Sequence, residues 1–460
     1  MRPNRALPAA FAALFAVGCS SCGADPGSTQ VSAPQIAPPE QSTEEVPATD
    51  PSSTPAALAL PARADDATPE TTAALVQASN AFGLDLWARL REEEGNRVFS
   101  PASISLALGM TWAGARGETG EQMARVLHFG EQEAVHAAAA ALLARWNDPG
   151  REQYELRVVN RLFGEQRYTF EQDFLALTRR RYGAPLEALD FSGAPDPSRQ
   201  HINAWVAGQT ADRIRDLLPP RSVDSDTRLV LTNAVYFLGK WVSPFEPNLT
   251  RDADFHVAPG RTVQVPTMHR TAPFAYGEAP GLTLLEMPYR GEDLAMVFLL
   301  PNERDGLDAL ERGLSAEALS GWLAALSSDP APGSLSPTRV AVSLPKFEID
   351  PASSTALKQT LVEMGMPVAF DRGAADFTGM ANPPDPRERL HISQVFHKAF
   401  VRVDEEGTEA AAATAVVMGR GAGPPPAQPK VFQADHPFLF LIRDLRSGMI
   451  LFLGRVSDPS

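Results

Sequence analysis

The chain has 460 residues, a formal net charge of −15 and 44% hydrophobic residues, which is enough to bury one large hydrophobic core. Its acidic balance argues against a nucleic-acid-binding surface, and the short basic run 179–181 is more typical of a solvated helix face than of a polyanion site. The two cysteines, Cys19 and Cys22, lie near the N-terminus, so we expect no disulfide and no cysteine-based metal site in the folded body.

The N-terminus has the outline of a secretory signal. Arg2 and Arg5 precede the apolar stretch 7–17, which is too short to span a membrane as a folded helix. The stretch leads into Cys19, and the residues AVGC resemble the end of a bacterial lipoprotein signal, in which the cysteine is lipidated. We therefore expect residues 1–19 to be a signal and the protein to lie outside the cytoplasm, in the periplasm, at the outer membrane or in the medium, with any membrane attachment through Cys19 alone. An ordinary cleaved signal is the alternative.

The next segment differs in composition from the rest of the chain. Residues 20–70 are mostly Pro, Ser, Thr and Ala, with few large apolar side chains, so burial cannot offset the entropy cost of ordering them. We predict a disordered tether there. Residues 71–460 are predicted to form one domain, because the motifs described below run through them without a break.

The body begins with helical patterns and then changes to strands. Apolar residues at helical spacing, with Ser100-Pro101 as the cap and first turn of the second helix, predict helices over residues 71–90, 100–112, 118–127, 131–146, 170–181 and 201–218. Alternating or continuous apolar runs predict strands over residues 98–99, 154–163, 229–236, 255–256, 263–268, 282–289, 294–300, 339–349, 434–442 and 449–459. Helices in one half and strands in the other indicate an α+β fold with mixed sheets.

The segment 404–415, with the sequence DEEGTEAAAATA, is suited to two conformations. Gly407 supplies a flexible pivot, and Ala410, Ala411, Ala412 and Ala413 have side chains small enough to enter a packed sheet without a clash. On propensity alone an alanine run is usually a helix. The following residues 418–426, MGRGAGPPP, cannot continue as a regular helix or a central strand, so we predict an exposed, cleavable loop.

Six blocks of sequence resemble the serpin family, in the family's order and spacing. They are residues 96–110, 114–123, 231–241, 344–349, 397–415 and the C-terminal pair 434–442 with 452–459. The resemblance implies a serpin fold, with helices packed around mixed β-sheets and an exposed reactive-centre loop near the C-terminus. It also implies an irreversible suicide-substrate inhibitor of serine proteases. In this mechanism the loop offers a peptide bond, and after acylation the segment that follows Gly407 inserts as a new central strand.

The resemblance assigns roles to further residues. Ser100, Ser103, Asn233 and His397 match the shutter, a polar cluster beneath the two strands that must part. Trp241 matches the aromatic residue of the breach at the top of the same opening. Glu405 and Lys346 match a pair that latches the hinge, and the hinge comprises Glu405, Gly407, Thr408 and residues 410–413.

The alternation of a strand makes insertion physically possible. Thr408, Ala410, Ala412 and Thr414 would share one face and carry no charge, so that face can be buried without desolvating an ion, whereas Glu409 falls on the opposite face. This pattern argues against a non-inhibitory serpin that acts as a carrier or folding helper. Inhibition of a papain-like cysteine protease through the same loop stays open.

Family spacing from Glu405 places the residue before the cleaved bond at Gly421. A loop shorter by one residue places it at Arg420, whose guanidinium suits the acidic pocket of trypsin-like proteases. We favour the bond Arg420–Gly421. The bonds Gly421–Ala422 and Met418–Gly419 are the alternatives, and the second of these would suit chymotrypsin-like or elastase-like enzymes.

The sequence carries no recognisable catalytic signature. It has no GxSxG elbow, no HExxH helix motif and no Walker A loop, and its eight histidines do not have ligand spacing. We therefore expect a monomer that is not an enzyme, needs no metal or cofactor, and has a serine protease as its partner.

Overall fold

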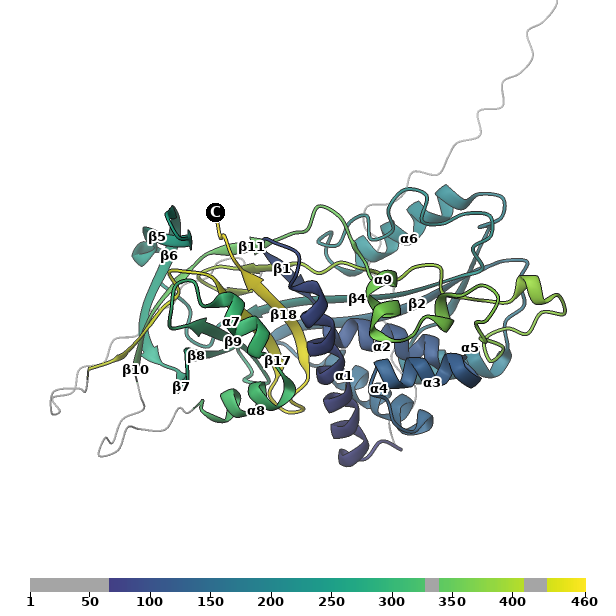
Figure 1. Cartoon of the computed structure of the whole chain (residues 1–460), viewed down its shortest axis with the longest axis horizontal. Coiled ribbons are helices and arrows are strands. Elements are labelled where there is room, and N and C mark those ends of the chain that lie inside the picture. The colour runs from purple at the N-terminus through teal and green to yellow at the C-terminus, as the bar shows by residue number, and fades with distance from the viewer. Residues whose placement is uncertain (1–65, 327–338, 409–427) are drawn as a thin grey trace, which may run out of the picture. The chain divides into compact units, whose positions relative to one another are not determined.

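Residues 66–326, 339–408 and 428–460 are described by a computed structural model and lie in the unit Thr54–Ser460 (Figure 1). The expected reactive bond, the hinge residues 410–413 and Cys19 lie outside the described residues.

Two well-capped helices open the described chain. The helix α1 (Pro69–Leu90) begins at Thr68, whose hydroxyl accepts the Thr71 amide at 3.2 Å while the Thr71 hydroxyl accepts the Thr68 amide at 2.9 Å. The helix α2 (Pro101–Trp112) begins at Ser100, and all of its residues except Ala107 are buried. The remaining helices are α3 (Gly117–Val126), α4 (Gln132–Trp146), α5 (Gln172–Tyr182), α6 (Pro195–Gln209), α7 (Leu307–Gly313), α8 (Ala316–Ala324) and α9 (Lys358–Met364).

A six-stranded sheet, hereafter the central sheet, has the strand order β11-β14-β15-β4-β2-β3. Its pairs are antiparallel except for β2 with β3, and β2 pairs with β4 from Tyr154 opposite Gly239 to Gly164 opposite Leu229. Its strands are β2 (Tyr154–Glu165), β3 (Leu186–Leu189), β4 (Leu229–Lys240), β11 (Phe347–Ile349), β14 (Val401–Val403) and β15 (Gly407–Thr408).

Helices cover both faces of the central sheet. Successive residues of a strand point to opposite faces, and Val158 and Val159 of β2 accordingly belong to different hydrophobic clusters. Val158 belongs to the main core with residues of α1, α2 and α4, whereas Val159 shares a smaller cluster with Val206 of α6. In Figure 1 the long strands β2 and β4 run between α6 and α2.

The other strands form a second six-stranded sheet, a four-stranded sheet and one short pair. The second sheet has the order β1-β18-β17-β9-β8-β7 and the four-stranded sheet has the order β16-β10-β6-β5, with β10 and β16 parallel. Their strands are β1 (Arg97–Phe99), β5 (Arg251–Ala258), β6 (Arg261–Pro273), β7 (Ala275–Ala279), β8 (Leu282–Pro288), β9 (Leu294–Pro301), β10 (Arg339–Pro345), β16 (Lys430–Gln433), β17 (Phe438–Asp444) and β18 (Ile450–Val456). The short pair is β12 (Thr355–Ala356) with β13 (Phe396–His397).

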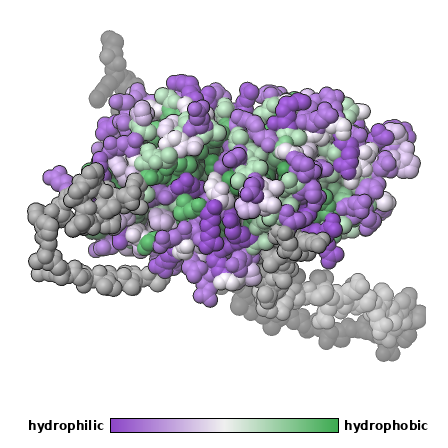
Figure 2. All heavy atoms as spheres, turned by 90° about the horizontal axis from the view of Figure 1, so that it is seen from below, coloured by the Kyte–Doolittle hydropathy of each residue, from purple (hydrophilic) through white to green (hydrophobic). Residues whose placement is uncertain are grey.

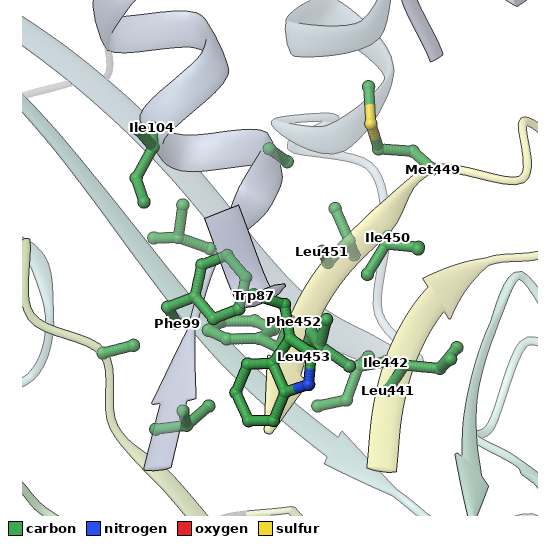
Figure 3. Close-up of a cluster of buried hydrophobic side chains, with 14 of the residues drawn as sticks. Trp87, Phe99, Ile104, Leu441, Ile442, Met449, Ile450, Leu451, Phe452 and Leu453 are labelled. Atoms are coloured by element: carbon green, nitrogen blue, oxygen red, sulfur yellow. The ribbon is translucent and has the colours of Figure 1, made fainter. Parts of the chain in front are cut away.

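The core joins the first helices to the C-terminal strands. Trp87 of α1 stacks on Phe99 of β1 with ring centroids 6.0 Å apart, and Figure 3 shows both beside Leu453 of β18. Each large side chain of this kind contributes about 1.5–3 kcal/mol when it is fully buried. The C-terminal residues therefore hold the N-terminal helices in place.

The surface of the described chain is largely hydrophilic on the face shown in Figure 2, where hydrophobic residues are visible in patches near the middle. Across the described ranges, no helix combines the length and the apolar character that a membrane span requires.

Two predicted elements are wrong in detail. The helix predicted over 201–218 is α6, Pro195–Gln209; it starts earlier because Pro195 suits a first turn, and it stops because Ala211 and Asp212 adopt φ values of 46° and 62°. The strand predicted over 339–349 is two strands, β10 and β11, which join different sheets on either side of Lys346. The sequence did not predict the short elements β3, β7, β12, β13, β14, β15, β16, α7, α8 and α9.

Candidate functional site

The root of the hinge is already a strand of the central sheet in the uncleaved chain. Gly407 and Thr408 form β15, in which Gly407 lies opposite Lys240 and Thr408 opposite Gly239 on β4, while Thr408 also lies opposite Val403 on β14. A side chain at Gly407 would collide with the carbonyl oxygen of Gly239, so this close approach requires glycine. Thr408 is only 3% exposed.

An aromatic pair receives the hinge at this end of the sheet. The Trp241 and Tyr289 rings stack with centroids 4.5 Å apart, and the Tyr289 and Thr408 hydroxyl oxygens are 2.6 Å apart. The Trp241 amide donates to the Glu406 carbonyl at 2.7 Å, and its indole N–H donates to the Asp404 carbonyl at 3.1 Å. The structure thus places Trp241 at the hinge and adds Tyr289, which sequence reasoning missed. We call this region the hinge end.

Glu405 and Lys346, the pair that the resemblance assigns as a latch, are in contact. Lys346 Nζ donates to one carboxylate oxygen of Glu405 at 2.8 Å, and the Thr250 hydroxyl donates to the other at 2.8 Å. Burial acts to raise the pKa of Glu405, but the hydrogen bonds from Lys346 and Thr250 outweigh it, so this pKa is lowered. Glu405 therefore stays ionised, and since Lys346 is about one-third exposed, the pair contributes only about 0–1 kcal/mol.

The four shutter residues lie in one chain of hydrogen bonds. Ser100 donates its amide to His397 Nε2 at 3.0 Å, and the Ser100 hydroxyl accepts the Ser103 amide at 3.1 Å. The Ser103 hydroxyl donates to the Asn233 side chain, which in turn donates to Asn160 Oδ1 at 2.6 Å. The chain links β13, the start of α2, β4 and β2. Asn160 extends the predicted cluster, and only its position directly opposite Asn233 on β2 identifies it.

His397 can act as an acceptor because it is neutral. Burial lowers its pKa to about 4, since a charged imidazolium would lose its hydration in this interior. At neutral pH the ring therefore offers a lone pair at Nε2 to the Ser100 amide.

A cavity lies beside the shutter at the other end of β4. Its volume is about 610 Å³, and its walls include residues 229–233 of β4, the α2 residues Ser103 and Ile104, and the segment 385–397. The pairing of β4 with β15 covers only Gly239 and Lys240, whereas β2 pairs with β4 along Leu229–Gly239. We call the region around residues 229–233, the cavity and the four shutter residues the shutter end.

The described ranges contain no group of three or more His, Cys, Asp or Glu side chains arranged to hold a metal ion. The described residues thus place a short paired strand at one end of β4 and a polar network at the other, with the long strand β4 between them.

Comparison with known proteins relates most of the chain to one family. Residues 77–459 match the family described as serpin (serine protease inhibitor). The leukocyte elastase inhibitor of Equus caballus is 41% identical over 393 residues, which cover 84% of this chain and 99% of that relative.

Two solved structures share the fold of this chain, and their names describe different properties. Cleaved Serpin 42Da has a TM-score of 0.74 at 30% identity, covering 85% of this chain and all (100%) of that one. Human thyroxine-binding globulin complexed with thyroxine has a TM-score of 0.73 at 28% identity, with coverage of 85% and 100%.

Proposed function

Because the chain belongs to the serpin family, we propose that it is an irreversible suicide-substrate inhibitor of serine proteases. The observation that carries the proposal is β15, since the residues before the expected loop already lie between β14 and β4. Cleavage of the loop would let the following residues extend this strand, and the acylated protease would be dragged along and distorted.

The register of β15 defines how far such an insertion can run. If β15 were extended in the same register, Glu409 would lie opposite Leu238. Met418 would then lie opposite Leu229, the first residue of β4. Thr408 is buried, so Ala410 and Ala412 would enter the same buried face without a charge, and Glu409 would point to the other face. The insertion is thus compatible with the packing on both faces.

We propose trypsin-like proteases as targets, with Arg420–Gly421 as the reactive bond. A trypsin-like pocket recognises a guanidinium by a charge-assisted, often bidentate contact. Arg420 is the one basic residue between Val416 and Pro429. An elastase-like target, as in the name of the relative above, would instead favour cleavage after Met418.

Incubation with trypsin tests the proposal. We expect a covalent complex that survives a denaturing gel, with a released C-terminal fragment that starts at Gly421. Arg420→Ala should lower the rate of trypsin inhibition by about two orders of magnitude, because a charge-assisted bidentate contact contributes about 3 kcal/mol. Lys430→Ala, which changes the next basic residue along the chain, is the matched control and should not change this rate.

The two alternatives give different outcomes in the same assay. Cleavage by trypsin, an elastase and papain without any complex would favour a non-inhibitory serpin. A complex with papain alone would indicate a cysteine protease inhibitor. A fragment starting at Gly419 or Ala422 would reject Arg420 as the reactive residue while leaving the inhibitory mechanism in place.

We further propose that the protein is a monomer outside the cytoplasm, held at a membrane through lipid on Cys19. The basic residues, the apolar stretch and the AVGC sequence support this proposal. Cys19→Ser should move the protein from the membrane fraction to the soluble fraction, whereas Cys22→Ser should not.

A further inference from the structure

We propose that Tyr289 is a positioning residue whose hydroxyl holds Thr408 in the central sheet before cleavage, so that insertion starts from a formed strand nucleus. The inference rests on the proposed inhibitory function, and it assigns a role to a residue that the sequence did not single out.

The hydroxyl pair lies in an interior site. Tyr289 is 0% exposed and Thr408 is 3% exposed, and their oxygens are 2.6 Å apart. Burial raises the pKa of Tyr289, so the phenol stays neutral and can donate. A buried hydroxyl that loses its partner is costly, so the pair favours the docked position of Thr408 over any position outside the sheet.

The phenol is held in place before Thr408 arrives. Its ring stacks on Trp241 and meets Phe237 edge-on, with centroids 4.7 Å apart. Its backbone amide donates to the Leu294 carbonyl at 2.9 Å, and Tyr289 also bridges to Trp241 through the backbone. The contacts with Phe237 and Leu294 do not involve the hinge, so they hold Tyr289 in place whether or not Thr408 is docked.

The contact favours the start of insertion without opposing its completion. Thr408 already occupies its strand position opposite Gly239, so later residues can enter the sheet without moving it. The same hydroxyl contact is therefore present before and after insertion, and it is absent only when the hinge leaves the sheet. Forming the first residues of a strand costs backbone entropy before further pairing can repay it. Because Thr408 is already docked, this loss of backbone entropy occurs before the protease cuts the loop.

The docked Thr408 affects the competition between two reactions that can follow acylation. After acylation, the inhibitor either inserts the loop or is hydrolysed and released as a cleaved product. A hinge that spends less time docked inserts later, so more protease escapes, whereas the acylation step itself does not depend on the hinge contact.

The experiment compares Tyr289→Phe with Tyr168→Phe. Tyr289→Phe removes one oxygen and keeps the stacked ring. Tyr168→Phe removes an exposed hydroxyl that donates to the Glu388 carbonyl at 2.7 Å, in the wall of the cavity at the shutter end and not at the hinge end. In the uncleaved chain, amide hydrogen exchange of residues 404–408 should be about fivefold faster in Tyr289→Phe, which is the ratio expected from one net hydrogen bond. Tyr168→Phe should match wild type.

A second readout uses the protease. Tyr289→Phe should raise the number of inhibitor molecules consumed per trypsin inhibited by a few fold, with an unchanged rate of loop cleavage. Thr408→Val, which removes the other hydroxyl, should act in the same direction. In the double variant, the increase in the number of inhibitor molecules consumed should be smaller than the product of the two single increases. The reason is that neither hydroxyl is then left unpaired.

The outcomes separate this inference from the function on which it rests. If wild type forms complexes but Tyr289→Phe leaves both hydrogen exchange and the consumption ratio unchanged, the role of Tyr289 is rejected. If Tyr289→Phe inhibits faster at an unchanged ratio, the contact restrains the loop and the nucleus is rejected. If wild type forms no complex with any protease, the inhibitory function fails, and hydrogen exchange alone still decides whether the hydroxyl pair holds the hinge.

Discussion

At the hinge end of the central sheet, β14, β15 and β4 lie side by side and the receiving side chains are buried, whereas at the shutter end β4 borders a cavity of about 610 Å³. The hinge end is stabilised by strand pairing, ring stacking and an ion pair. The shutter end is stabilised by one chain of hydrogen bonds between neutral groups. The difference suggests a direction for insertion, from the end where a strand is already placed toward the end where partners can exchange.

The largest effect on stability should come from insertion of the cleaved loop into the central sheet, along β4 toward the shutter end. Extension of β15 along β4 from Leu238 to Leu229 adds about ten residues to the sheet, and each net hydrogen bond contributes about 1 kcal/mol. A chain cut between Val416 and Pro424 should therefore be more stable than the intact chain by about 5–10 kcal/mol, with a clearly higher melting temperature. Thermal melts before and after limited proteolysis measure this. An equal or lower melting temperature after the cut would argue against insertion.

The next largest effect should come from blocking the hinge end. Thr408→Arg would place a guanidinium against Tyr289 and Trp241, where an unpaired buried charge costs about 3–5 kcal/mol. The variant should be cleaved by trypsin as an ordinary substrate without forming a covalent complex. Glu409→Arg is the matched control, because residue 409 would fall on the opposite face if β15 were extended, and the residue at this position already carries a charge. Complexes at wild-type yield in Thr408→Arg would rule out the docked strand as the start of insertion.

Acid should loosen the shutter end before the hinge end. The pKa of His397 is lowered from 6.5 to about 4, so its neutral form is favoured in the fold, and the stability it contributes above pH 6.5 is lost as the pH falls toward 4. The total loss is about 3 kcal/mol. The pKa of Glu405 is lowered from 4.5, so the latch stabilises the fold above that value and is lost only at lower pH.

Hydrogen exchange at pH 5 and pH 7 tests this order. At pH 5 the amide of Ser100 should exchange faster relative to pH 7 after correction for the intrinsic rate, while the amides of residues 404–408 should not. His397→Gln keeps an acceptor that does not titrate and should remove most of the difference. His136 is the control for a general acid effect, because burial lowers its pKa to about 4 as well and it contacts Tyr182 rather than the shutter. A His136→Gln chain should keep the pH response at Ser100.

The smallest effect should come from the latch. Lys346→Ala removes a pair whose lysine is one-third exposed, so the free energy of unfolding should fall by about 0–1 kcal/mol. Chemical denaturation of the intact chain measures it. A loss much larger than this would mean that the latch, and not the paired strands with Tyr289, holds the hinge in place.

Several parts of the site could be predicted because their signals are local or belong to a family pattern. Ser100 before Pro101 predicts a helix start, and the structure has that cap, with the Ser100 hydroxyl accepting the Ser103 amide. The apolar runs at the C-terminus predict β17 and β18, both of which are almost entirely buried. The hinge, latch and shutter residues came from the resemblance, and the structure brings those that it describes into contact at the two ends of β4.

The sequence by itself therefore determined the long helices and strands and the start of α2, since periodicity and capping act over a few neighbouring residues. Its motifs also determined which family the chain resembles. Only the tertiary structure decided that Tyr289 meets Thr408 across 119 positions of the chain and that Asn160 continues the shutter from Asn233 across 73 positions. It also decided that β10 and β11 enter different sheets although one apolar run contains both. These outcomes depend on which distant strands become neighbours, and strand partners and registers are set by packing over the whole domain, not by the local pattern.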